Sequence, residues 1–175
     1  MYDQQFPHKR FKLTFQFLEK HISNTSNILD LGVENPFTKI MKEQGYSVEN
    51  TKGEDLDLDT SFIRNSDSEV VTAFEIFEHL LSPFTVLQDI QATKLVASIP
   101  LKLWFASAYR SKTDMRDRHY HEFEDWQFDW LLEKAGWKII ARQKWTNPTK
   151  KFGIRPILRW FTPRYYIVYA ERIIK

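Results

Sequence analysis

A short apolar strand, a turn and a capped helix follow one another within residues 28–45. The run ILDLG at 28–32 is typical of a buried strand that ends in a tight turn. Asn35 is suited to cap a helix, Pro36 to begin it and Gly45 to follow its end. A strand that leads directly into a helix predicts a βα unit, and such units build parallel sheets.

The later apolar segments repeat this alternation of strands and helices. Helices are expected over residues 9–22, from Ser82-Pro83 to Gln91, and over the segment that holds Phe128, Leu131, Leu132 and Ala135. Further strands are expected at 46–51, 69–73, 94–99, 137–142 and 165–170, and residues 54–59 are either a short strand or a loop. The pattern predicts an α/β fold: a doubly wound, mostly parallel, seven-stranded sheet with helices on both faces. Ligands bind such sheets at the carboxyl ends of the strands.

The length of 175 residues suits one domain over residues 1–175, with an N-terminal helix in 1–26, a core in 27–142 and a basic insertion in 143–164. The absence of cysteine excludes disulfides, thiolate metal sites and cysteine nucleophiles. No apolar run approaches the roughly 20 residues of a membrane span, and no secretory signal is expected. A cytoplasmic location is therefore expected.

Charge is distributed unevenly along the chain. From Arg142 to the end, nine basic side chains are opposed only by Glu171, whereas acidic residues dominate 49–78. The basic stretch KKFGIRPILRWFTPR at 150–164 interleaves cationic and apolar side chains. It is either an ordinary basic insertion, a substrate lid, a membrane-surface patch or a nucleic-acid site. Nucleic acid is a possible partner but is not favoured over a small molecule.

Several motifs follow one another in a recognisable order. They are DLG at 30–32, FEIFEHLLSP at 74–83, SIP at 98–100, HYHEF at 119–123 and AGW at 135–137. Over residues 27–142 their order resembles that of class I S-adenosylmethionine-dependent methyltransferases of type 11/23. The resemblance implies a Rossmann-like methyltransferase fold, S-adenosylmethionine as cofactor and transfer of its methyl group.

The same resemblance implies a set of cofactor-binding residues. Asp30 and Gly32 belong to the first strand and its turn, and Glu49 is the nearest candidate to hold ribose hydroxyls at the second strand. Asp55 and Leu56 resemble the pair that receives the adenine. Phe74 and Glu75 would lie where a central strand opens onto the cofactor.

The turn departs from the family pattern, because only the first of the expected glycines is present and Glu34 occupies the next glycine position. The Glu34 carboxylate would either face the carboxylate of the cofactor and weaken binding, or pair with its amino group. A helix capped by Asn35 and begun by Pro36 would still offer free amides to the cofactor.

Glu75, Glu78 and His79 are spaced at i, i+3 and i+4 and would share one face of a helix, with Phe74, Phe77 and Leu81 opposite. The pattern resembles the metal-binding helix of small-RNA terminal 2′-O-methyltransferases, which His119 or His121 would complete. Structural roles are nevertheless favoured for this face, and no metal is assigned. His79 and His121 are the candidate general bases.

Three functions remain open from the sequence. The leading one is an S-adenosylmethionine-dependent methyltransferase that acts on a polar or anionic small molecule. The first alternative is a methyltransferase-like binding module that has lost the cofactor, and the second is a metal-assisted RNA 2′-O-methyltransferase. The sequence determines neither the methyl acceptor nor the oligomeric state.

Overall fold

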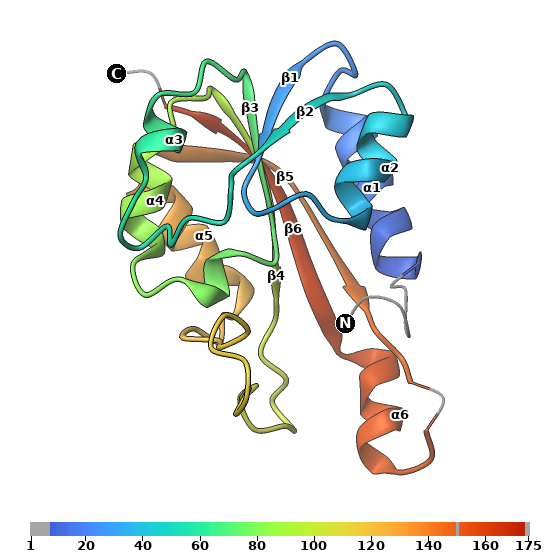
Figure 1. The fold of residues 1–175 in the computed structure, drawn as a ribbon. Helices are drawn as coiled ribbons and strands as arrows, with labels where there is room; N and C mark the ends of the chain where they lie inside the picture. The colour runs from blue at the N-terminus through green and yellow to red at the C-terminus, as the bar shows by residue number, and fades with distance from the viewer. Residues whose placement is uncertain (1–7, 150, 174–175) are drawn as a thin grey trace.

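The computed structural model describes residues 8–149 and 151–173, which form a twisted six-stranded sheet with helices on both faces (Figure 1). The strands are β1 (Asn27–Asp30), β2 (Ser47–Asn50), β3 (Val70–Phe74), β4 (Lys94–Pro100), β5 (Trp137–Thr146) and β6 (Pro163–Arg172). The helices are α1 (His8–His21), α2 (Pro36–Glu43), α3 (Ser61–Arg64), α4 (Pro83–Asp89), α5 (Asp125–Lys134) and α6 (Ile154–Phe161), with a 3₁₀ turn, η1 (Phe77–His79).

The strands are arranged in the order β2-β1-β3-β4-β6-β5. β1 is parallel to β2 and to β3, and β3 is parallel to β4. Only β6 runs antiparallel to its neighbours, β4 and β5. The predicted doubly wound, mostly parallel sheet is therefore confirmed, but the prediction of seven strands is wrong, since the described residues form six.

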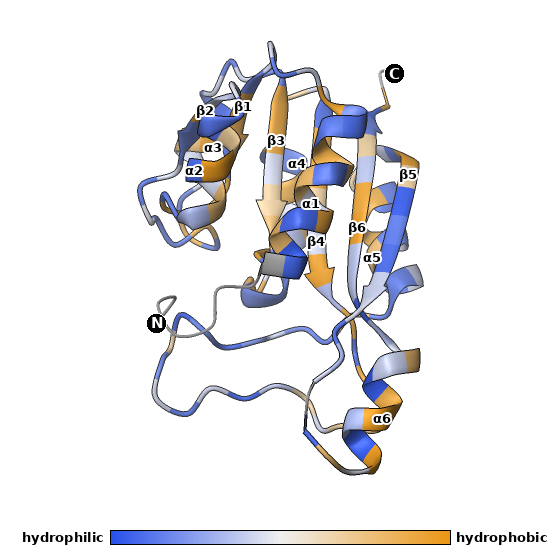
Figure 2. Ribbon diagram, turned by 90° about the vertical axis from the view of Figure 1, so that its right-hand side faces the viewer, coloured by the Kyte–Doolittle hydropathy of each residue, from blue (hydrophilic) through white to orange (hydrophobic). Residues whose placement is uncertain are grey.

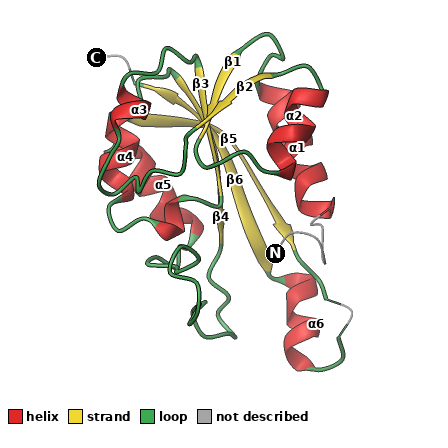
Figure 3. Cartoon of the chain, in the orientation of Figure 1, coloured by secondary structure: helices red, strands yellow, loops and turns green. Residues whose placement is uncertain are grey.

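Residues 54–59 form turns in place of the short strand that was one alternative (Figure 3). The Asp55 carboxylate accepts a hydrogen bond from the backbone amide of Asp57 at 3.1 Å, and the Asp59 carboxylate accepts one from Ser61 at 2.9 Å. Aspartate side chains that bond nearby amides offer the backbone an alternative to the ladder of a sheet. The acidic composition of this segment therefore favours a loop.

Alternate residues along the central strands face two separate cores. Ile28 and Val70 pack with apolar side chains of α1 and α2, whereas Leu29 and Val71 pack with those of α3, α4 and α5. Because successive side chains of a strand point to opposite faces, a strand that is buried on both faces reads as a continuous apolar run.

The helix signals in the sequence coincide with the observed ends of helices. α1 covers most of the predicted segment 9–22, and α2 begins at Pro36 after its N-cap, Asn35. Gly45 follows α2 with a φ of +90°, which the missing Cβ permits. None of the described helices is long and apolar enough to cross a membrane.

Asp57 holds the start of α4 from a distant loop. Its carboxylate accepts hydrogen bonds from the amides of Leu81 and Ser82, each at 2.8 Å. Asp57→Ala removes this cap, and we expect the free energy of unfolding in urea to fall by about 1 kcal/mol. Asp67→Ala, at an exposed position of the loop before β3, is the control and should change it little. Equal losses in the two variants would contradict the capping role.

Candidate functional site

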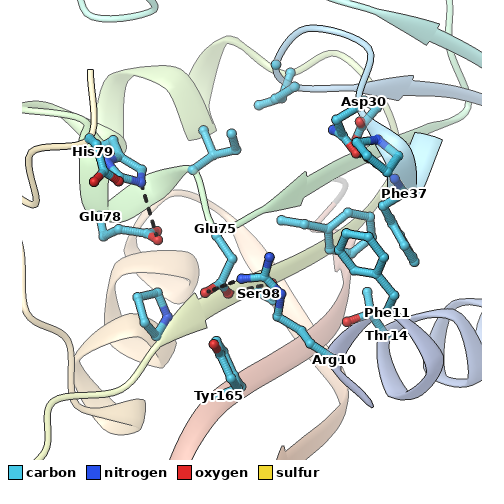
Figure 4. Close-up of a pocket in the computed structure, with 18 of the residues that line it drawn as sticks. Arg10, Phe11, Thr14, Asp30, Phe37, Glu75, Glu78, His79, Ser98 and Tyr165 are labelled. Atoms are coloured by element: carbon cyan, nitrogen blue, oxygen red, sulfur yellow. Dashed lines mark hydrogen bonds and ion pairs between the residues drawn. The ribbon is translucent and has the colours of Figure 1, made fainter. Parts of the chain in front are cut away.

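A cavity of about 530 Å³ opens at the carboxyl ends of β1, β3 and β4, beside Gly32 (Figure 4). Its walls come from α1, the turn between β1 and α2, the turn after β3, the long loop between β4 and α5, and the start of β6. The cavity volume lies within the range of about 300–1,000 Å³ that is usual for small-molecule sites. The cavity therefore lies at the carboxyl ends of the parallel strands, where α/β sheets of this kind bind their ligands.

Asp30 ties together the elements that surround this edge. Its buried carboxylate accepts hydrogen bonds from Thr72 Oγ1 at 2.6 Å, Thr38 Oγ1 at 3.1 Å and Asn50 Nδ2 at 3.1 Å. These partners lie on β3, α2 and β2. Burial raises the pKa of Asp30 from 3.8 to about 6, although the three hydrogen bonds oppose the rise. Asp30 therefore fixes the framework of the cavity.

Gly32 makes the turn after β1 possible. Its φ is +115°, a conformation that side chains with a Cβ rarely adopt. Its amide donates to Thr51 Oγ1 at 2.7 Å, and its carbonyl accepts from Asn50 Nδ2 at 3.1 Å. Gly32 thus lines the cavity, while its amide and carbonyl are hydrogen-bonded to the side chains of Thr51 and Asn50.

The first turn of α2 is capped by its own chain. Asn35 Oδ1 accepts hydrogen bonds from the amides of Phe37 at 2.8 Å and Thr38 at 3.2 Å, and Pro36 has no amide hydrogen. These are the amides that would otherwise bind an anion at a helix N-terminus. The expectation that they remain free for the cofactor is wrong, because the Asn35 side chain occupies them.

Glu34 does not fill the cavity, although it contributes to its lining. Its carboxylate pairs with Lys42 in the last turn of α2, at 2.7 Å, and about half of the side chain is exposed. The hydrogen bond from Lys42 lowers the pKa of Glu34 below its usual value. Neither alternative for Glu34, repulsion by the cofactor or pairing with its amino group, anticipates this ion pair.

Glu75 projects into the cavity from a strained backbone. With a φ of +59°, it is the one non-glycine residue in the described part of the chain with a positive φ, a conformation that costs about 1–2 kcal/mol. Its carboxylate accepts a hydrogen bond from Ser98 Oγ at 2.9 Å and lies 3.5 Å from Arg10 of α1. Figure 4 shows Arg10 and Tyr165 directed toward this carboxylate. Burial raises the pKa of Glu75, and Arg10 opposes that rise.

Glu78 is a buried carboxyl group with one oxygen unpaired. Its Oε2 has no hydrogen-bond partner among the described residues. Burial, and then the nearby Glu75, raise the pKa of Glu78 well above its usual value. Glu75 precedes the 3₁₀ turn η1, so the predicted helical face is not formed, and Leu81 is exposed. Glu75, Glu78 and His79 nevertheless all line the cavity.

The orientation of His79 is set by a backbone carbonyl. His79 Nδ1 lies 2.9 Å from the carbonyl oxygen of Arg118, which can only accept, so Nδ1 carries the hydrogen. In the neutral ring Nε2 is then the basic nitrogen, and it lies 3.7 Å from Glu78 Oε1. The His119 ring packs edge-on against His79, with centroids 4.7 Å apart. Burial, and then His79, lower the pKa of His119.

The remaining predicted site residues are divided between the cavity and the rest of the fold. Phe74 lines the cavity and packs edge-on against Phe37. Glu49 and Asp55 are exposed and Leu56 belongs to the core, and none of the three is among the described residues that line the cavity. His121 also lies outside this lining, with Nε2 at 3.4 Å from the carbonyl of Leu81.

Sequence reasoning missed the cationic part of the site. The sequence places Arg10 in the N-terminal helix and Arg164 in the basic insertion, yet both line the cavity with Tyr165. Arg10 is 65 positions from Glu75 in the sequence, so no local spacing connects them. The only signal in the sequence is that the two side chains have opposite charges, which many other pairs of residues share.

Comparisons with solved structures reveal the same architecture. The 1,6-didemethyltoxoflavin N1-methyltransferase of Burkholderia thailandensis, solved with S-adenosylhomocysteine, matches with a TM-score of 0.67 at 15% identity, over 98% of this chain and 82% of that chain. The magnesium protoporphyrin IX methyltransferase of Synechocystis PCC 6803, also solved with S-adenosylhomocysteine, matches with a TM-score of 0.61 at 11% identity, over 94% and 82%. The cyclase SpnF matches with a TM-score of 0.61 at 13% identity, over 100% and 86%.

The chain has the class I S-adenosylmethionine-dependent methyltransferase fold. The sequence matches no model of a protein family, and no curated protein sequence matches it significantly. Because one of the similar structures is a cyclase, the methyltransferase fold does not by itself define the reaction.

Asp30 gives the methyltransferase fold a distinctive pH dependence. Its pKa of about 6 lies above the 3.8 of an unperturbed aspartate, so this group favours the folded state most at low pH and loses that contribution as the pH rises through 6. Between about pH 5 and about pH 7.5, we expect wild type to lose roughly 1–2 kcal/mol more unfolding free energy than Asp30→Asn. Urea denaturation at both pH values measures the difference. Parallel changes in the two proteins would contradict the buried titration.

Proposed function

We propose that this protein is an S-adenosylmethionine-dependent methyltransferase that acts on a polar or anionic small molecule. The observation that carries the proposal is the cavity beside Gly32, which combines buried carboxyl groups with two arginines and is not filled by Glu34. The similar structures that contain S-adenosylhomocysteine support the choice of cofactor.

The charges around the cavity are complementary to those of the proposed cofactor. S-adenosylmethionine carries a sulfonium and an ammonium group as well as a carboxylate, and supplies a methyl group that is activated for transfer. Glu75 and Glu78 would face its positive groups, and Arg10 would pair with its carboxylate in place of the capped helix amides. Phe74 and Ile76 supply apolar walls next to Gly32.

His79 is the proposed general base. Its Nδ1 hydrogen is held by Arg118, which leaves Nε2 available to take the proton that a hydroxyl or amine acceptor loses on methylation. Arg164, which also lines the cavity, would attract an anionic acceptor. The chain would then contribute mainly by aligning the acceptor and excluding water.

Calorimetry with S-adenosylhomocysteine tests the cofactor site directly. We expect binding to the wild-type chain and a loss of roughly 10- to 100-fold in affinity for Arg10→Gln, because a charge-assisted hydrogen bond is removed. Arg155→Gln, on α6 and outside the lining of the cavity, is the matched control and should bind as wild type does. The absence of binding heat at millimolar ligand would remove the enzyme proposal and favour the binding module.

One cluster favours a second candidate, metal-assisted 2′-O-methylation of RNA. One ligand atom from each of Glu78, His79 and His119 lies within 4.8 Å of the others. The unpaired Glu78 Oε2 and the Nε2 of His79, oriented by the Arg118 carbonyl, form a donor set that suits Mn²⁺ or Fe²⁺.

Titration with Mn²⁺ distinguishes this candidate from a metal-free enzyme. If the cluster binds metal, calorimetry should detect one Mn²⁺ site that His119→Ala weakens at least roughly tenfold, as expected for the loss of a ligand. His121→Ala is the control, since His121 lies outside the cluster. No binding of Mn²⁺ by the wild-type chain would exclude this candidate and leave the cofactor proposal untouched.

A further inference from the structure

The connection between β5 and β6 extends away from the sheet as a protruding hairpin that carries α6 (Figures 1 and 2). We call residues 151–163 the α6 hairpin. None of the residues of α6 is buried, and its contacts are made mainly with the ends of β5 and β6. The helix therefore contributes almost nothing to the core of the protein.

The apolar side of α6 faces outward. Ile154, Ile157 and Phe161 follow at i, i+3 and i+7, so they share one side of the helix. These three side chains and Trp160 are between 58% and 80% exposed, and Phe152 is fully exposed in the turn before the helix. A helix at the surface of a globular protein normally turns its apolar stripe to the core. The reversed arrangement indicates that this surface contacts something else.

All the charged residues of the α6 hairpin are basic. Lys151, Arg155 and Arg159 accompany the apolar stripe, and the sequence has no acidic residue between Glu133 and Glu171. Within the described residues, none of these three cations forms an ion pair. Together the two sides match an amphipathic helix that lies in the interface of a lipid bilayer, with cations at the headgroups and aromatic side chains among the acyl chains.

We propose that the α6 hairpin binds the surface of an anionic phospholipid membrane. Uncompensated cations fit a negatively charged partner, whereas two copies of this hairpin would repel each other. Phe152, Trp160 and Phe161 could stack on bases, but the branched aliphatic side chains Ile154 and Ile157 cannot. The mixed aliphatic and aromatic surface therefore suits acyl chains better than nucleic acid.

Membrane binding would bring the cavity next to the bilayer. α6 ends at Phe161, and only Thr162 and Pro163 separate it from Arg164 and Tyr165, which line the cavity. Figure 2 shows the hairpin beyond the end of the sheet toward which the arrows of β3 and β4 point, and the cavity opens at that same end. The membrane proposal stands independently of the proposed reaction, because it rests on the hairpin alone.

Sedimentation with vesicles tests the proposal. The full chain should bind vesicles that contain phosphatidylglycerol, bind vesicles of pure phosphatidylcholine far more weakly, and dissociate as the salt concentration rises. Arg155→Gln combined with Arg159→Gln should weaken partitioning about 25-fold, since each basic residue near an anionic surface contributes about fivefold. Ile157→Ser combined with Phe161→Ser should weaken it by at least roughly tenfold through lost apolar burial. Trp130→Ser, at an exposed aromatic position on α5, is the matched control and should bind as wild type does.

Three results would overturn the proposal. The first is an absence of binding to the anionic vesicles by a chain whose circular dichroism shows it to be folded. The second is equal binding by wild type and by both double variants. The third is wild-type self-association or RNA binding that occupies the hairpin and prevents vesicle binding. None of these measurements involves S-adenosylmethionine. A result that overturns the membrane proposal would therefore leave the cofactor proposal untouched.

Discussion

A single buried carboxylate, that of Asp30, connects the elements at the carboxyl ends of the parallel strands, where the cavity opens. It accepts hydrogen bonds from Thr38, Asn50 and Thr72, which belong to three different elements. Asn50 also bonds to the carbonyl of Gly32, so the same network holds the turn after β1. Removing the carboxylate would leave several buried donors unpaired, a cost of about 1–3 kcal/mol for each. The network thereby fixes the positions of α2, β3 and the turn after β1, whose residues line the cavity beside Gly32.

The network also determines which groups remain available to a ligand. Thr38 donates to Asp30 while its amide is capped by Asn35, so the N-terminus of α2 serves the fold itself. A charged ligand would therefore meet side chains, namely the carboxyl groups of Glu75 and Glu78 and the guanidinium of Arg10. Glu75 lines the cavity from a backbone with a positive φ, and such strained conformations are common at functional sites.

Sequence reasoning recovered the parts of the fold that depend on local signals. The strand ending at Gly32, the cap at Asn35 and the glycine after α2 follow from residue preferences within a few positions. The prediction of a seventh strand is wrong because acidic side chains of residues 54–59 accept hydrogen bonds from nearby backbone amides. These bonds compete with strand pairing, and the pattern of apolar residues does not reveal them. The pairing of Arg10 with Glu75 depends on tertiary packing, so no motif contains it. The sequence analysis predicts no helix within residues 150–164, so the outward apolar face of α6 could not be located, although a membrane-surface patch is one of the alternatives for this stretch.

The central claim is that the cavity beside Gly32 binds the adenosyl cofactor through side chains while the Asn35 cap stays in place. A crystal structure of the chain with S-adenosylhomocysteine is the most direct test. We predict density for the ligand in this cavity, its carboxylate beside Arg10, and the hydrogen bonds from Phe37 and Thr38 to Asn35 intact. A ligand bound elsewhere, or one that displaces Asn35 to reach the amides of α2, would contradict the account.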